Sequence, residues 1–232
     1  MKLRRFVFII TTLLAASLWA HGQSNVVPLS ATNSPSLAPL PLKLPFPSLK
    51  DNWGGIPTGP DIEPLTNSRP DFLAPAGVVN VAFGKRVTAS SPPFGGSLAL
   101  VTDGEKQPYD HLVAEFRRGV QWVQIDLGTT FEIYAVVFWL DHRWPSVYRG
   151  VVVAVADDVN FIKDVRVLFN NDKENLVGLG TGTVMRYVES RLGKLVDAKG
   201  TKARYVRVYA NGSNLSKINC FTEIEVWALP SK

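Results

Sequence analysis

The stretch FEIYAVVFWL (131–140), followed directly by DHRWPSVYRG (141–150) and VVVAVADD (151–158), organises the chain. Its outer parts are rich in β-branched and aromatic residues, which is typical of buried strands. The middle part carries Asp, Pro and Gly, which favour turns. We predict two central strands, at 131–139 and 150–157, joined by a polar and aromatic loop. If the protein binds a ligand, we expect this loop to contact it.

Composition indicates a single domain with a hydrophobic core, because the 232 residues are 46% hydrophobic. The formal charge of +5 falls to +2 without Lys2, Arg4 and Arg5, which lie in a predicted targeting segment. No basic cluster is interleaved with aromatic residues, so no nucleic-acid partner is predicted. The single cysteine, Cys220, excludes an intrachain disulfide and a Cys-based metal site. It is either a buried, unreactive thiol or an intermolecular bridge.

Residues 1–22 are predicted to be a secretory signal peptide. A charged start precedes the apolar run 6–19, and Ala20-His21-Gly22 is a small-x-small site with cleavage after Gly22 or Ala20. The apolar run is short for a membrane span, although an uncleaved anchor is the alternative. We therefore expect a secreted or extracytoplasmic protein with no transmembrane segment in the mature chain.

Residues 23–76 are predicted to be a Pro-rich disordered linker before a folded domain at 77–230. Eleven of the 16 prolines fall in this segment. Such a composition favours an extended, polyproline-like chain and opposes a packed core. A spacer is the simpler interpretation, and a peptide ligand for an aromatic groove is the alternative.

From about Gly77 onward, short strands recur between turn signals. In Trp122–Leu127 apolar and polar residues alternate, as in a strand with one buried face. No amphipathic helix longer than a few turns is visible. The pattern predicts an all-β sandwich. Further strands are expected at 86–90, 165–169, 185–189, 205–209 and 221–228.

A series of motifs follows the same order along this part of the chain: Asn80–Ser90, Val101–Gly104, Trp122–Gly128, Tyr148–Asp158, Ala203–Tyr209 and Phe221–Val226. Together they resemble the discoidin domains, the coagulation factor V/VIII type C family, which overlaps the discoidin-like carbohydrate-binding modules. The resemblance covers about residues 79–229. It implies a jelly-roll β-sandwich with a galactose-binding-like arrangement, in which loops at one end hold the ligand.

The loop Asp141–Tyr148 contains the residue types that a sugar site needs. Trp144 or Tyr148 would supply an aromatic face for a pyranose. Arg143 offers a rigid donor fork, and His142 can donate or accept a hydrogen bond. The alternative is that the aromatic side chains pack the loop and that Arg143 pairs with Asp141.

The loop 211–219 follows a strand and could reach the same end. Asn211 and Asn214 suit sugar hydroxyls, because an amide offers two donors and an acceptor. Asn211 precedes a glycine, so an ordinary turn is the alternative for it.

The resemblance also implies a structural calcium ion at the turn Asp103-Gly104, held with Glu223. Calcium takes six to eight oxygen ligands, many of them backbone carbonyls. The alternative is an ordinary turn and a solvated glutamate.

Catalysis is poorly supported by the sequence. Asp141 and His142 are chain neighbours, which does not make a triad, and no histidine spacing suits a metal. We predict an exported, non-catalytic module that binds a cell-surface or extracellular glycan or glycoprotein. The alternatives are a protein–protein adhesion domain, a phospholipid-surface binder using Pro92-Pro93-Phe94 or Trp144, and an enzyme. The sequence does not indicate an oligomeric state.

Overall fold

A computed structural model describes residues 36–47 and 55–231. The predicted signal peptide and the first part of the predicted linker lie outside these residues. The chain from Pro35 to Lys232 forms one compact unit. None of the described segments is a helix of the length and apolarity needed to cross a membrane.

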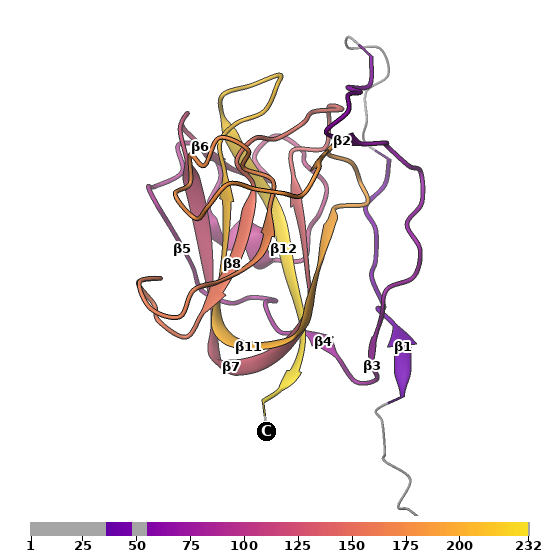
Figure 1. Ribbon diagram of the computed structural model, residues 1–232, viewed down its shortest axis with the longest axis vertical. Helices are drawn as coiled ribbons and strands as arrows, with labels where there is room; N and C mark the ends of the chain where they lie inside the picture. Colours follow the sequence, from indigo (N-terminus) through magenta and orange to yellow (C-terminus); the bar gives the residue numbers. More distant parts are fainter. Residues whose placement is uncertain (1–35, 48–54, 232) are drawn as a thin grey trace, which may run out of the picture. The chain divides into compact units, whose positions relative to one another are not determined.

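Two long strands, β7 (Gln121–Leu140) and β11 (Lys194–Ala210), build the β-sandwich. Both curve, so that each contributes to two layers (Figure 1). The first half of β7 pairs with β5 (Val87–Ala89), and its second half pairs with β12 (Asn219–Pro230). The predicted all-β sandwich is confirmed. The other elements are β1 (Leu37–Pro39), β2 (Ile62–Glu63), β3 (Leu73–Pro75), β4 (Val79–Asn80), the 3-10 helix η1 (Leu98–Thr102), β6 (Ala114–Phe116), β8 (Val152–Ala156), β9 (Arg166–Asn170) and β10 (Arg186–Tyr187).

The main sheet runs β4-β12-β7-β11-β8-β9, with β5 joined to β7 and β6 joined to β12. All of these pairs are antiparallel. The sequence predicted separate strands at 122–127 and 131–139, whereas the structure joins them into β7. Gly128 lies between them with φ +91°, a conformation that glycine adopts readily, and the strand turns there without breaking.

The core fills the space between the layers. Val123, Ile125 and Leu127 from the first half of β7 point into it, and Val136 and Phe138 from the second half meet them. Each of these side chains is at most 1% exposed. The alternation of apolar residues along a strand therefore fixes which face is buried.

The outer face of the second half of β7 is also covered. Trp139 on this face forms a second cluster with Trp227, and Leu40, Leu42 and Phe72 pack against it. β1 pairs with β3 in the same region. The prediction of a disordered linker is therefore corrected for 36–47 and 55–76. Their prolines keep the chain extended, but the residues between them bury apolar side chains on the sheet.

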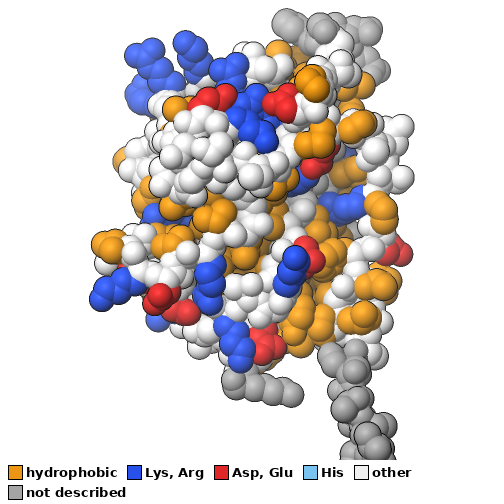
Figure 2. Space-filling model, viewed as in Figure 1, with side chains coloured by type: hydrophobic (Ala, Val, Ile, Leu, Met, Phe, Trp, Pro, Cys, Tyr) orange, Lys and Arg blue, Asp and Glu red, His pale blue; other side chains and the backbone are white. Residues whose placement is uncertain are grey.

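One end of the sandwich gathers three connections between the strands (Figure 1). These are the loop 141–151 after β7, the loop 211–218 between β11 and β12, and the segment 105–113 before β6. Figure 2 shows Lys and Arg side chains crowded at the end opposite the C-terminus.

Candidate functional site

The two loops chosen from the sequence lie against each other. Tyr148 and Ser213 form an isolated antiparallel bridge. The Asn214 backbone N–H donates to the Val147 carbonyl at 3.0 Å, and the Val147 N–H donates to Asn214 Oδ1 at 2.7 Å. The expectation that both loops reach the same end is confirmed. The side-chain oxygen of Asn214 serves to hold them together.

A cavity of about 410 Å³ lies between these loops, within the usual size range of small-ligand sites. Three separate segments contribute to it, namely β6, the loop after β7, and the region from the β11–β12 loop into β12. Its walls mix apolar, hydroxyl and charged groups. The lining residues are Glu115, Asp141, Arg143, Trp144, Ser146, Tyr148, Ser213, Leu215, Ser216, Ile218 and Cys220.

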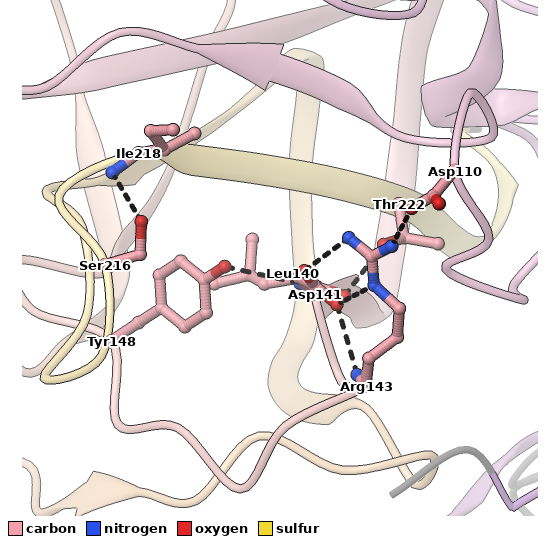
Figure 3. A network of polar contacts seen from close by, with 8 residues as sticks. All are labelled: Asp110, Leu140, Asp141, Arg143, Tyr148, Ser216, Ile218 and Thr222. Carbon is pink, nitrogen blue, oxygen red and sulfur yellow. Dashed lines mark hydrogen bonds and ion pairs between the residues drawn. The ribbon is translucent and has the colours of Figure 1, made fainter. Parts of the chain in front are cut away.

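Arg143 is held in a network of carboxylates (Figure 3). Its Nε donates to Asp141 Oδ1 at 2.9 Å, and Nη2 donates to Asp141 Oδ2 at 2.8 Å. Nη1 donates to Asp110. The bond with Asp141 is the main reason that the pKa of Arg143 lies above its ordinary value. A guanidinium has five N–H groups, so two remain, one on each terminal nitrogen.

The pairing of Arg143 with Asp141 matches the alternative considered from the sequence. Although they pair with each other, both Arg143 and Asp141 still line the cavity. A bidentate pair holds its geometry better than a single charged side chain. The wall therefore presents fixed donors beside fixed carboxylate oxygens.

Replacing Asp141 by asparagine is expected to lower the free energy of unfolding by about 1–3 kcal/mol, because charge-assisted hydrogen bonds to a partly buried arginine are lost. Asp110→Asn is the matched control. Its carboxylate is 86% exposed, against 12% for Asp141, so its loss should cost less than about 1 kcal/mol. Urea unfolding of the wild type and the two variants measures these losses. Equal losses in both variants would contradict the larger contribution that we assign to Asp141.

The two predicted aromatic residues differ in position. Trp144 is partly exposed and lines the cavity. Tyr148 is only 4% exposed, and its hydroxyl accepts a hydrogen bond from the Asp141 N–H at 3.4 Å. Burial raises the pKa of Tyr148 well above its ordinary value. Trp144 is therefore the partly exposed aromatic residue of the cavity wall, and Tyr148 is part of the floor.

The prediction for His142 is corrected. Its side chain is fully buried, and Nε2 lies 2.8 Å from the Lys106 carbonyl oxygen. Burial lowers the pKa of His142, which favours the neutral ring. Because a carbonyl can only accept, Nε2 carries the proton in this contact. His142 links the loop to the segment before β6 and does not line the cavity.

The two asparagines chosen in the second loop lie outside the cavity, and their predicted role in ligand binding stays a prediction. Asn211 lines a neighbouring cleft, and neither Asn211 nor Asn214 lines the cavity. Ser213 and Ser216 of the same loop do line it. The only sequence signal for these two serines was their position in the loop, because serine is common in turns and does not by itself indicate a binding site. Glu115, on the short strand β6, carried no sequence signal.

The predicted calcium residues lie together. The Gly104 N–H donates to Glu223 Oε2 at 3.2 Å, and the neighbouring Asp103 contributes to raising the pKa of Glu223. Glu223 is fully buried, and its Oε1 has no hydrogen-bond partner within the described part of the chain. Burial is the largest cause that raises its pKa, to about 9. Among the described residues no group of three or more His, Cys, Asp and Glu side chains could hold a metal. Any metal here would need backbone carbonyls as well.

No protein-family model matches the chain, and no curated protein matches it. Among solved structures, a family 89 glycoside hydrolase from Clostridium perfringens is similar, with a TM-score of 0.50 and 17% identity over 66% of this chain. The match spans 15% of the hydrolase. The chain shares its fold with part of that enzyme. This likeness supports the sandwich fold predicted from the sequence.

Two smaller domains are also similar, with lower TM-scores. The CBM32 domain of AlyQ, in complex with 4,5-unsaturated mannuronic acid, matches with a TM-score of 0.45 and 18% identity, over 62% of this chain and 95% of that domain. The lectin domain of lectinolysin, complexed with Lewis B antigen, matches with a TM-score of 0.44 and 21% identity, over 66% of this chain and 98% of that domain.

Proposed function

We propose that this chain is an exported, non-catalytic module that binds a glycan or glycoprotein in the cavity beside Trp144. The observation that carries the proposal is the cavity itself. It has the size of a sugar site and joins one partly exposed tryptophan to a preformed Arg143–Asp141 pair. The tryptophan can stack on the apolar face of a sugar ring, and the arginine–aspartate pair can bond the hydroxyl groups on the edge of the ring.

In this proposal the ring stacks on Trp144. The two remaining N–H groups of Arg143 donate to sugar oxygens, and the carboxylate of Asp141 accepts from a hydroxyl. Ser213 and Ser216, from the loop 211–218, also line the cavity. Because the Arg143–Asp141 pair is already assembled, little side-chain entropy is lost on binding.

The cavity has few groups suited to catalysis. Glycoside cleavage by the usual route needs two carboxylates, one as acid and one as base or nucleophile. Asp141 and Glu115 are the two carboxylates of the lining. Both oxygens of Asp141 already accept hydrogen bonds from Arg143, so Asp141 is poorly suited to act as the acid, base or nucleophile. Burial raises the pKa of the Cys220 thiol to about 12, which opposes a nucleophilic role.

A glycan array probed with the purified chain, once with calcium and once with a chelator, tests the proposal. We expect binding to at least one glycan class in the presence of calcium. Absence of binding to every glycan would overturn it. Sedimentation with anionic and neutral vesicles in parallel tests the phospholipid-binding alternative.

We propose further that Glu223 and Asp103, with backbone carbonyls of the same turn, hold a structural calcium ion. The unpaired buried oxygen of Glu223 supports this, because a buried carboxylate oxygen without a partner is costly. Bound calcium would supply the missing positive charge and fasten the turn to β12.

Calcium at a hundredfold excess over its Kd is expected to stabilise the wild-type protein by about 2.7 kcal/mol. Glu223→Gln should remove this response. Asp71→Asn, which removes an exposed carboxylate elsewhere, should keep it. Thermal unfolding with calcium or chelator measures the effect. If Glu223→Gln is still stabilised by calcium, the ion binds elsewhere and the proposed site is wrong.

A further inference from the structure

A second hollow lies beside the cavity, on the other side of the loop 211–218. It has a volume of about 710 Å³. Four of its residues are cationic and one is acidic, and Lys and Arg side chains crowd this end of the molecule (Figure 2). We call it the basic cleft. Its lining residues are Arg118, Gly119, Arg149, Glu174, Leu176, Arg186, Asn211 and Lys217.

One of the four cations is already neutralised. Arg186 pairs with Glu174 at 2.8 Å and with Asp61 at 3.2 Å. Within residues 36–47 and 55–231, the side chains of Arg118, Arg149 and Lys217 form no ion pair, and all three residues are exposed. The basic cleft therefore carries an unbalanced positive charge from three side chains.

The backbone under these side chains is tied together by a buried asparagine. Asn219 is fully buried, and its Nδ2 donates to the carbonyls of Arg117 and Gly119 at 3.0 and 2.9 Å. Its Oδ1 accepts from the Gly212 N–H at 2.6 Å, and the Arg149 N–H donates to the Gly212 carbonyl at 2.8 Å. The turns that carry the cations are thus held to one point, so the backbone positions from which the charges extend into the cleft are fixed before a ligand binds.

The loop 211–218 separates the basic cleft from the cavity. Asn211 and Lys217 line the cleft, whereas Ser213 and Ser216 line the cavity. The cavity contains carboxylates and would disfavour an anionic group. An oligosaccharide that crosses the loop could place a neutral ring face on Trp144 and an acidic substituent in the cleft.

We propose that the basic cleft is an anion subsite, and that the glycan bound by this chain carries carboxylate or sulfate groups. The proposal rests on the proposed glycan-binding function. Nucleic acid fits the cleft less well, because the lining has no aromatic residue on which a base could stack. A membrane surface fits less well because Leu176 is the one large apolar residue of the lining.

The test compares each acidic oligosaccharide with its neutral counterpart. One arm uses oligogalacturonate and its methyl ester, and the other uses a sulfated galactan oligosaccharide and its desulfated form. The charge variant is Arg118→Gln/Arg149→Gln/Lys217→Gln. The matched control, Arg86→Gln/Lys163→Gln/Lys199→Gln, removes three cations that do not line the cleft. Calorimetry at low and at physiological salt gives the affinities, and duplex DNA is titrated as a competing polyanion.

In at least one arm the acidic form should bind the wild-type protein about tenfold or more tightly than its neutral form, and salt should reduce this advantage. The charge variant should lose the advantage and keep its affinity for the neutral form, and the control should keep both. Equal affinities for acidic and neutral forms would overturn the anion subsite while leaving the glycan-binding function intact. An equal loss in the control, or DNA binding as tight as that of the acidic oligosaccharide, would also overturn it. No binding of any of these four oligosaccharides would overturn the anion subsite, and the glycan array would still decide the glycan-binding function.

Discussion

Trp144→Ala is expected to weaken glycan binding by about 10- to 100-fold. An aromatic side chain that buries its face against a ligand contributes about 1.5–3 kcal/mol, and each 1.4 kcal/mol corresponds to a factor of ten. Trp144 is the partly exposed aromatic residue of the cavity, whereas Tyr148 is buried in its floor. Calorimetric titration with the best-bound glycan from the array measures the loss.

Phe46→Ala is the matched control for this prediction. Phe46 is 80% exposed and does not line the cavity, so its removal should leave the affinity unchanged. The unfolding midpoints of both variants should be recorded, so that a loss of binding is not confused with a loss of folding. An undiminished affinity in Trp144→Ala would contradict the assignment of this cavity as the sugar site.

Glu189→Gln is expected to stabilise the protein above pH 8. Glu189 is fully buried beneath the site loop, where its backbone N–H donates to the Ser146 carbonyl at 2.8 Å. Its Oε1 accepts from the Leu140 N–H at 3.4 Å, and the nearby Tyr187 hydroxyl lowers the pKa of Glu189 by less than burial raises it. Burial is the main cause that raises its pKa from 4.5 to about 8.

The direction of this effect follows from proton binding. Between pH 4.5 and 8 the folded protein retains a proton that the unfolded chain releases, so raising the pH through this range lowers the free energy of unfolding. The loss is about 3–5 kcal/mol at 1.36 kcal/mol per pKa unit. Glutamine keeps the shape and cannot ionise. The variant and the wild type should therefore have similar stability near pH 5 and diverge toward pH 8.5.

Urea unfolding at several pH values measures this divergence. All other titrating groups are common to both proteins, so the difference isolates Glu189. Glu105→Gln, on an exposed carboxylate, is the control and should follow the wild type at every pH. If the difference in the free energy of unfolding between Glu189→Gln and the wild type is the same from pH 5 to 8.5, Glu189 does not retain a proton in the folded protein and the prediction is wrong.

The strands that hold the site were predictable because burial on one face imposes a period of two. The alternation at Val123, Ile125 and Leu127 is enough to identify the core face of that strand. The first half of β11 was missed. Its residues 194–203 contain Gly, Lys and Asp, which weaken a strand signal, and pairing with β7 overrides that local preference.

The location of the candidate site was predictable, but several of the side chains that line its cavity were not. The loop 141–148 combines Arg143 and Trp144, and both line the cavity. His142 lies between Asp141 and Arg143 in the chain and yet points inward, because neighbouring residues in a loop face different directions. The burial of a polar ring depends on a distant acceptor, here the Lys106 carbonyl, which the sequence does not reveal.

The covering of the sheet by 36–47 and 55–76 was missed for a related reason. Proline content describes how extended a segment is, and it does not tell what the segment lies against. Leu40 and Leu42 alternate with prolines, and their packing partner Trp227 lies near the far end of the chain. The apolar outer face of β7 was the only sign that a cover was needed.

A crystal structure of the chain with the best-bound glycan would test the central claim most directly. We predict a sugar ring stacked on Trp144, with hydroxyl groups within hydrogen-bond distance of Arg143 and Asp141. A glycan bound instead on a face of the sandwich, or in the grooves beside residues 36–47, with the cavity left free, would contradict the account.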